Sequence, residues 1–143
     1  MDSKWDRRFL ELAKHVASWS KDPSTQVGCV LANDRNIVVG MGYNGFPRGI
    51  EDTEARLNDR PTKYELMVHA EVNAILNANG PVRDTTAYCT LAPCDICMKF
   101  LIQSGVRRIA SPAVSPELRD RWGTKLDLAV KLANEAGVEL VEL

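Results

Sequence analysis

The stretch from Thr85 to Ala110 reads TTAYCTLAPCDICMKFLIQSGVRRIA and decides the fold. Its first part, Thr85 to Leu91, has the β-rich composition of a strand. Cys94 to Ser104 has the spacing of a helix that ends at Gly105, and Val106 to Ala110 is again typical of a strand. A strand, a helix and a second strand in succession predict two parallel strands joined by a helical crossover.

The segments before this unit add a helix, a hairpin and a further helix. Apolar residues at helical spacing predict a helix over Ser3–Ser20, and two short apolar runs around a polar turn predict paired strands over Val27–Ala32 and Ile37–Met41. Glu51–Lys63 has no clear periodicity, so we expect a long loop there. Tyr64–Asn77 returns to helical spacing and is expected to form one helix.

The segments after the unit complete the expected architecture. The pattern predicts a long helix over Glu117–Ala136 and a short last strand over Val138–Val141. Strands that alternate with helices after an antiparallel hairpin predict an α/β fold. We therefore expect a three-layer α/β/α sandwich with a mixed five-stranded sheet, formed by residues 1–143 as a single domain.

The composition of the chain limits the kinds of molecule that it is expected to bind. The 18 basic residues against 19 acidic ones give a net charge of −1, so there is no overall field to attract nucleic acid. No apolar run has the length of a membrane span, and the start, Met1 to Asp6, lacks a signal-peptide pattern. We expect a cytoplasmic protein with no membrane partner.

His69, Cys94 and Cys97 are candidate metal ligands. Cys94 and Cys97 are one helical turn apart and directly follow a strand, and His69 is placed near the start of another helix. In a crossover architecture both helix starts lie at the same end of the sheet. Three protein ligands leave one position of a tetrahedral zinc site open to water, which is typical of a catalytic zinc. A structural zinc needs a fourth ligand, and a pair of disulfides is disfavoured in a reducing cytosol.

Glu71 is the candidate catalytic residue. It lies two residues after His69, on the same first turn of the helix. There it is close enough to reach a metal-bound water without binding the metal. A carboxylate in that place can take the proton of the water and pass it to the substrate. His-Ala-Glu followed by Pro-Cys-x-x-Cys matches the arrangement known for the zinc nucleobase deaminases.

Four motifs extend this match over roughly Phe9 to Ile109. They are Ser20-Lys21-Asp22-Pro23-Ser24-Thr25-Gln26-Val27-Gly28, Gly42-Tyr43-Asn44-Gly45-Phe46-Pro47, His69-Ala70-Glu71-x-Asn73-Ala74-Ile75 and Thr90-x-x-Pro93-Cys94-x-x-Cys97. With these motifs the chain resembles the deoxycytidylate (dCMP) deaminase family within the cytidine deaminase superfamily. The resemblance implies a cytidine deaminase-like fold, a catalytic zinc ion and the hydrolytic deamination of dCMP to dUMP and ammonia. Some members of the family carry an extra zinc site, but no spare His/Cys cluster occurs between Gly45 and Val68, so we expect one zinc ion per chain.

The resemblance also implies roles for residues around the metal. Asn44 contacts the sugar, Ala70 reads the carbonyl edge of the pyrimidine through its backbone, and Val27 packs on the ring. Further expected substrate contacts are Lys21, Ser24 and Thr25 at the polar end of the nucleotide, and Tyr43 beside Asn44. The family further implies a homo-oligomer, often a hexamer.

Several alternatives stay open at this point. From Ser111 onward the sequence departs from the family pattern, so 5-modified dCMP, CMP, dCTP and deoxycytidine remain candidate substrates. A nucleic-acid base editor needs basic or aromatic docking surfaces, which the near-neutral charge disfavours. Trp122 is a candidate either to cap the base pocket or to anchor the last helix. Cys29 and Cys89, inside strands, are expected in the core.

Overall fold

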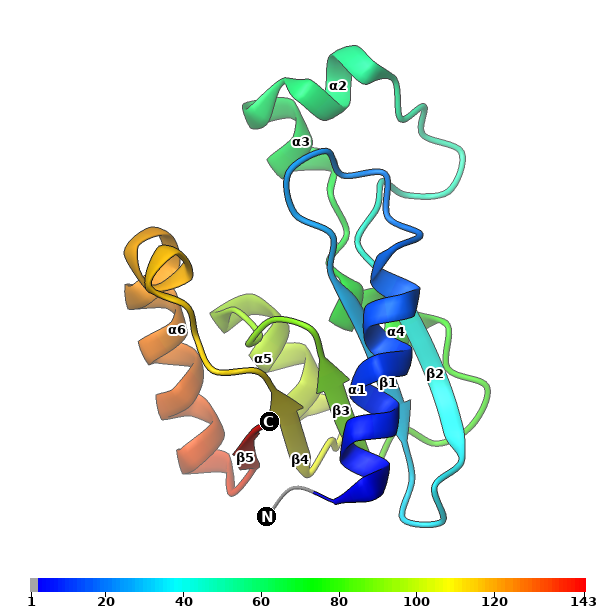
Figure 1. Cartoon of the computed structure of the whole chain (residues 1–143), viewed down its shortest axis with the longest axis vertical. Coiled ribbons are helices and arrows are strands. Elements are labelled where there is room, and N and C mark those ends of the chain that lie inside the picture. The colour runs from blue at the N-terminus through cyan, green and yellow to red at the C-terminus, as the bar shows by residue number, and fades with distance from the viewer. Residues whose placement is uncertain (1–2) are drawn as a thin grey trace.

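The computed structural model describes residues 3–143 and has one five-stranded sheet in the order β2-β1-β3-β4-β5 (Figure 1). The strands are β1 (Gly28–Ala32), β2 (Val38–Tyr43), β3 (Thr86–Cys89), β4 (Arg108–Ser111) and β5 (Glu139–Glu142). The helices are α1 (Lys4–Ala17), α2 (Glu54–Asn58), α3 (Arg60–Leu66), α4 (Ala70–Leu76), α5 (Asp95–Gln103) and α6 (Pro116–Ala136). β1 pairs antiparallel with β2 and β3, whereas β3–β4 and β4–β5 are parallel. The expected mixed sheet and its crossovers are confirmed.

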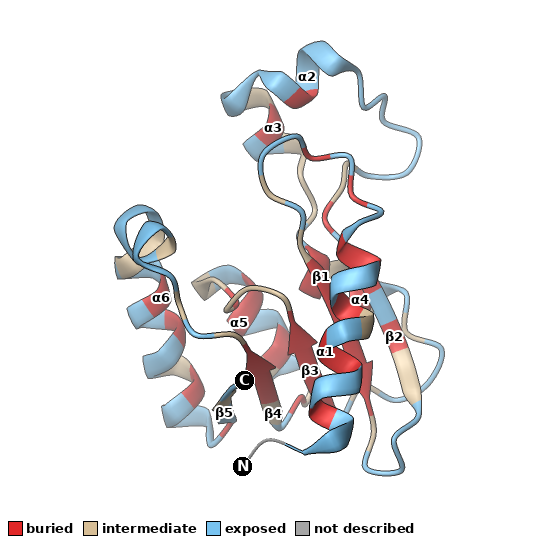
Figure 2. Ribbon diagram, in the orientation of Figure 1, coloured by how far each residue is buried: buried red, intermediate tan, exposed pale blue. Residues whose placement is uncertain are grey.

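The sheet separates two hydrophobic cores, which gives the expected three layers. On one face, α1 packs Phe9 and Ala13 against Val30 and Tyr88. On the other face α4, α5 and α6 cover the alternate strand residues, because successive strand side chains point to opposite faces. Figure 2 shows β1, β3, β4 and the inward helix faces buried, with β5, α2 and α3 largely exposed. No helix built from residues 3–143 is long and apolar enough to cross a bilayer.

Cys29 and Cys89 belong to the second core, as expected. They are opposite each other on β1 and β3 and fully buried. The Cys89 thiol donates a hydrogen bond to Cys29 Sγ at 3.8 Å, and no disulfide joins the two. Asp6 lies at the edge of the first core. Its carboxylate accepts hydrogen bonds from Nη1 and Nη2 of Arg108, each at 2.8 Å, and from the Tyr88 hydroxyl at 2.9 Å. These bonds connect α1 to β3 and β4.

Two expectations between Glu51 and Asn77 are wrong. The segment expected as a loop contains α2 and α3, which begin at the N-caps Thr53 and Asp59. The single helix expected over Tyr64–Asn77 is broken, because Val68 forms an antiparallel bridge with Gly45. This bridge requires an extended backbone, so α3 ends before it and α4 begins after it.

Gly42 sets the position of α4 on the sheet. A Cβ atom there would lie 2.4 Å from the backbone nitrogen of Ala74 and 2.6 Å from the carbonyl oxygen of Ala70. Because glycine has no side chain, β2 and the first turn of α4 touch backbone to backbone. Asn73 adds a hydrogen bond from its Nδ2 to the Tyr43 carbonyl at 2.8 Å. The start of α4, with its functional residues, is thereby fixed against the sheet.

Candidate active site

The three candidate metal ligands converge. Ligand atoms of His69, Cys94 and Cys97 all lie within 4.8 Å of one another, although these residues belong to two separate helix starts. His69 Nδ1 lies 3.1 Å from Cys97 Sγ and 3.6 Å from Cys94 Sγ. Cys97 is buried, Cys94 is half-buried and His69 is exposed, so the cluster is open to solvent on the histidine side.

The two helix starts use their N-cap side chains differently. His69 is the N-cap of α4 in an extended conformation, and its side chain makes no capping hydrogen bond. Cys94 is the N-cap of α5, and its Sγ accepts a hydrogen bond from the Cys97 backbone N–H at 3.5 Å. An N-cap faces the unsatisfied N–H groups of the first turn, which favour a thiolate.

The acid–base state of the cluster follows from its hydrogen bonds. The hydrogen bond with Cys97 lowers the pKa of Cys94 to about 4. The same hydrogen bond, together with burial, raises the pKa of Cys97. The interaction with Cys94 also raises the pKa of His69. Cys94 therefore loses its proton more readily than Cys97.

These residues fit zinc. Tetrahedral Zn–S and Zn–N bonds place neighbouring sulfur and nitrogen ligand atoms about 3.6 Å apart. The 3.6 Å separation of His69 Nδ1 and Cys94 Sγ agrees with this value, and the 3.1 Å separation from Cys97 Sγ is somewhat shorter. Thiolate and imidazole are also the ligands that zinc prefers. Within residues 3–143 this is the one such group of three or more metal-binding side chains.

Glu71 lies beside the ligands and is shielded from solvent. Its side chain is in the first turn of α4 and the residue is only 4% exposed. Burial raises the pKa of its carboxyl, an effect that the Cys97 thiol and His69 oppose. A buried carboxyl with a raised pKa holds a proton more readily than an exposed one, which suits it to general acid–base catalysis.

Asn44 is placed beside the ligands but is engaged with the protein. Its Oδ1 accepts a hydrogen bond from the Val27 N–H at 2.8 Å, and its Nδ2 donates to the Thr25 carbonyl at 2.9 Å. The next residue, Gly45, pairs with Val68 immediately before His69. Asn44 therefore holds residues 25–27 beside the metal ligands, and its expected contact with the sugar stays a prediction.

A buried ion pair, which the sequence did not reveal, supports the same segment. Lys63 Nζ on α3 lies 3.0 Å from Asp22 Oδ1 and donates to Ser24 Oγ at 2.6 Å. Asp22 also accepts hydrogen bonds from the backbone N–H groups of Ser24 and Thr25. The Ser24 hydroxyl and the N–H groups of Ser24 and Thr25 therefore stabilise the loop through Asp22. A lone lysine in a polar segment gives no sequence signal for such burial.

Lys21 and Tyr43 line a pocket of about 140 Å³ together with Asn44, Trp19 and Asp52. No metal ligand lines this pocket. Lys21 forms an exposed ion pair with Asp52 at 3.0 Å. Their expected contacts with the nucleotide stay predictions.

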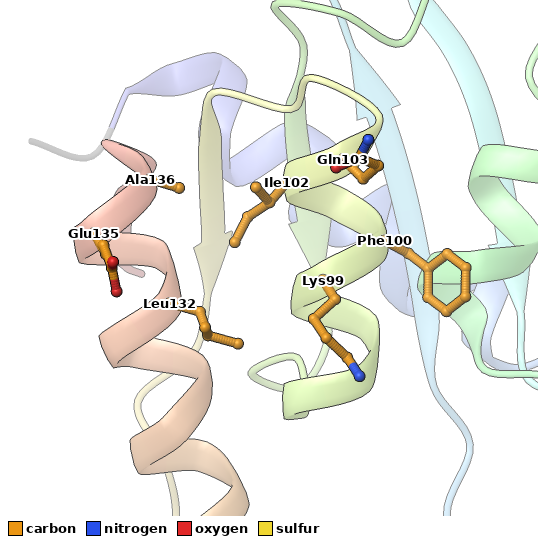
Figure 3. Close-up of a pocket in the computed structure, with 7 residues that line it drawn as sticks. All are labelled: Lys99, Phe100, Ile102, Gln103, Leu132, Glu135 and Ala136. Carbon is orange, nitrogen blue, oxygen red and sulfur yellow. The ribbon is translucent and has the colours of Figure 1, made fainter.

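A larger groove of about 620 Å³ lies between α5 and α6. Figure 3 shows Ile102 and Leu132 pointing into the space between the two helices, with Lys99 on α5 and Glu135 on α6. None of the metal ligands or Glu71 lines this groove. It is therefore a separate surface feature.

Comparison with known proteins agrees with this geometry. The family model described as "Cytidine and deoxycytidylate deaminase zinc-binding region" matches residues 3–111. The chain is 40% identical over 143 residues to an "Uncharacterized deaminase in luxG 3'region" of Aliivibrio fischeri, with 100% of this chain and 96% of the relative covered. It is 39% identical over 112 residues to the deoxycytidylate deaminase of Homo sapiens, covering 74% of this chain and 63% of the human protein.

The fold is also found in a solved structure. The dCMP deaminase of the cyanophage S-TIM5, crystallised in complex with dCMP and dUMP, superposes with a TM-score of 0.78. The match covers 100% of this chain and 99% of that one at 19% sequence identity, which shows a shared fold. With the family match and the converging zinc ligands, these findings establish that the chain belongs to the cytidine and deoxycytidylate deaminase family of zinc-binding enzymes.

Proposed function

We propose that this chain is a deoxycytidylate deaminase, which converts dCMP and water into dUMP and ammonia. The observation that carries the proposal is a buried Glu71 next to converging His69, Cys94 and Cys97. The motifs that surround this cluster are those of the dCMP branch, and the human relative of that name is 39% identical over 112 residues. The chain spans only 63% of the length of the human protein. We therefore propose the substrate for this chain from its own residues as well as from the relative.

The chemistry divides between the metal and Glu71. Zinc, when bound by His69, Cys94 and Cys97, supplies the acidity that lets a water molecule lose a proton near neutral pH. Glu71 takes that proton and transfers it to N3 of the pyrimidine. It then takes the second proton, from the hydroxyl added at C4, and gives it to the departing amine. A C4–O bond forms and the C4–N bond breaks, with ammonia as the leaving group. Because Glu71 is buried, it exchanges protons with the substrate rather than with bulk water.

The base is positioned by the segments that meet at the start of α4. Ala70 is fully buried directly after His69, and Val27 is held in place by the Asn44 side chain. We infer that Val27 packs on the pyrimidine ring and that the Ala70 backbone binds its carbonyl edge. Asn44 contacts the sugar from the position in which it also holds residues 25–27.

We further propose that the protein acts as a homo-oligomer. Ile96 and Phe100 lie one helical turn apart on α5 and are 47% and 51% exposed, and Phe100 lines the groove between α5 and α6. Lys99 and Glu135 on opposite walls offer complementary charges to a second copy. Light scattering should give a mass above that of one chain, with a lower mass for Phe100→Ser; a monomeric wild-type protein contradicts this.

We also propose that residues 1–143 form one deaminase domain that works in the cytoplasm. One sheet runs from β1 near the start of the chain to β5 near its end, which supports a single domain. The cysteines of the core and of the metal site are free, which suits a reducing compartment.

An ultraviolet assay of the zinc-loaded protein tests the substrate. The assay compares dCMP with CMP, deoxycytidine, dCTP, 5-substituted dCMP and a cytosine-containing single-stranded DNA. We expect dCMP to be turned over with the highest kcat/KM. If the protein deaminates another cytosine compound but not dCMP, the proposed reaction stands and the proposed substrate is refuted. If the DNA is the preferred substrate, the protein is a nucleic-acid base editor.

A further inference from the structure

The side-chain amide of Asn44 uses both of its N–H donors within the protein. Asn44 is 6% exposed, and its Nδ2 donates to the Thr25 carbonyl at 2.9 Å and to Asp22 Oδ2 at 3.4 Å. Its Oδ1 accepts one hydrogen bond, from the Val27 N–H at 2.8 Å. An amide group has two donors on its nitrogen and two acceptor sites on its oxygen. The side chain of Asn44 therefore has one acceptor site left for a ligand and no donor.

These contacts determine which way the amide faces. If the amide were turned over, Oδ1 would face the Asp22 carboxylate and the Thr25 carbonyl, and Nδ2 would face the Val27 N–H. Acceptors would then face acceptors and donors would face donors, and buried polar groups without partners are costly. Asp22 is the charged member of this set, and a charged acceptor distinguishes an N–H from an oxygen more strongly than a carbonyl does.

Lys63 holds the Asp22 carboxylate in place for this contact. Lys63 Nζ lies 3.0 Å from Asp22 Oδ1, and the two side chains are only 7% and 6% exposed. The same oxygen accepts hydrogen bonds from the backbone N–H groups of Ser24 and Thr25. Because Oδ1 is occupied by these groups, Oδ2 is the oxygen that contacts Asn44. A cation on α3 thus acts on the Asn44 amide through one carboxylate.

The same segments lead directly to a metal ligand. Gly45, which follows Asn44, exchanges two backbone hydrogen bonds with Val68, at 3.1 Å and 2.8 Å. Val68 is followed by His69, the N-cap of α4, and α3 with Lys63 ends just before the bridge. The bridge therefore fixes where the Asn44 amide lies relative to the metal ligands.

We propose that Asp22 and Lys63 are positioning residues of the deamination, which keep the Asn44 amide with its oxygen available to the nucleotide. The inference rests on the proposed function, in which Asn44 contacts the sugar. A deoxynucleoside 5′-monophosphate has one sugar hydroxyl, at the 3′ position, and this hydroxyl is the only donor of the sugar. Asn44 Oδ1 accepts a hydrogen bond from it while the amide keeps its orientation. Asp22 and Lys63 act through Asn44 and do not touch the substrate.

The experiment compares two nucleotides that differ only in that hydroxyl. Steady-state kinetics with dCMP and with 2′,3′-dideoxycytidine 5′-monophosphate are measured for the zinc-loaded wild-type enzyme and for Lys63→Met. The wild-type enzyme should prefer dCMP about tenfold in kcat/KM, because the dideoxy compound leaves a buried acceptor without its donor. Lys63→Met should reduce this preference to about twofold or less, mainly by raising KM for dCMP.

A second variant separates positioning from stability. Lys63→Met alone leaves the Asp22 carboxylate buried without its counter-ion, whereas the Asp22→Asn/Lys63→Met double variant removes both charges. The oxygen of the new amide still accepts the N–H groups of Ser24 and Thr25, so the loop should stay folded. Its NH₂ group then faces the NH₂ group of Asn44 and no longer favours the wild-type orientation. This variant should have the circular dichroism spectrum of the wild type and still lose the preference for dCMP.

Lys14→Met is the matched control. Lys14 is exposed on α1, which covers the opposite face of the sheet from α4 and α5. This variant should keep the wild-type ratio of kcat/KM for the two nucleotides.

Two results would overturn the assignment. One is a double variant that keeps the wild-type ratio, whether both activities fall together or neither falls, because the ion pair then only stabilises the fold. The other is a wild-type enzyme that does not distinguish the two nucleotides. If the wild-type enzyme deaminates dCMP while either result is found, the positioning assignment alone fails. If the wild-type zinc enzyme deaminates no cytosine compound, the proposed function fails and the assignment falls with it.

Discussion

Replacing the buried Lys63 with methionine is expected to lower the free energy of unfolding by about 3 kcal/mol at neutral pH. Methionine keeps most of the apolar stem of the lysine but removes its ammonium group. The Asp22 carboxylate then loses the partner that lies 3.0 Å away. The loop that carries Ser24 and Thr25 loses its attachment to α3, so kcat/KM for dCMP should fall as well.

The magnitude follows from burial. The side chains of Lys63 and Asp22 are only 7% and 6% exposed, so removal of one charge leaves the other buried without its counter-ion. Breaking such a pair typically costs about 3–5 kcal/mol. Asp22 keeps hydrogen bonds from the backbone N–H groups of Ser24 and Thr25, which places the expected loss at the lower end of that range.

Lys21→Met provides a matched control. Lys21 and Asp52 are also 3.0 Å apart, but their side chains are 69% and 40% exposed. Solvent screens an exposed pair, so this substitution should change the free energy of unfolding by less than about 0.5 kcal/mol. Urea unfolding of the three proteins, followed by circular dichroism, measures both effects.

The difference between wild type and Lys63→Met should also depend on pH. Burial raises the pKa of Asp22, but the N–H groups of Ser24 and Thr25 together with Lys63 hold it below its ordinary value. A carboxyl with a lowered folded pKa stabilises the fold above its unfolded pKa of about 4, and loses that contribution as the pH falls through the folded value. The difference should therefore shrink as the pH is lowered toward about 3. A Lys63→Met protein as stable as Lys21→Met, or a difference that grows in acid, refutes this reasoning.

Two further perturbations test the rest of the structure. Asp6→Asn should lower the free energy of unfolding by about 3 kcal/mol in urea at neutral pH, because Arg108 loses its paired carboxylate and Tyr88 its acceptor. Arg108 and Tyr88 hold the pKa of Asp6 well below its usual range, so this loss too should diminish as the pH is lowered below about 4, and a pH-independent difference counts against it. In zinc-free protein, iodoacetamide should label Cys94 before Cys97 at about pH 6, because their mutual hydrogen bond lowers the pKa of Cys94 to about 4 and raises that of Cys97. Zinc should protect both thiols, and peptide mass spectrometry that finds equal labelling of the two in the zinc-free protein contradicts the assignment.

The sequence predicts the features of the fold that depend on local pattern. The strand, helix and strand of residues 85–110 are at their expected places, and the position of Cys29 and Cys89 inside strands correctly assigns both to the core. The metal cluster is also predictable, since Cys94 and Cys97 follow a strand directly and helix starts after parallel strands converge.

Features that depend on long-range contacts are not predictable in this way. The break between α3 and α4 arises from the bridge of Val68 with Gly45, which local periodicity does not contain. The buried position of Lys63 depends on Asp22, which is distant in the sequence. Likewise, the contact of Trp122 on α6 with Tyr64 on α3 joins two segments that are distant in the sequence. In each case tertiary contacts override what the segment alone suggests.

The most direct test of the central claim is the kcat for dCMP of zinc-loaded Glu71→Gln, with the zinc content measured on the same sample. Glutamine has the size of glutamate but cannot carry the proton, so kcat should fall about 1,000-fold or more. His69, Cys94 and Cys97 are unchanged, so the zinc content should equal that of the wild-type enzyme. A variant that keeps near-normal kcat, or that loses its zinc, contradicts the role of Glu71 as the proton carrier beside the metal.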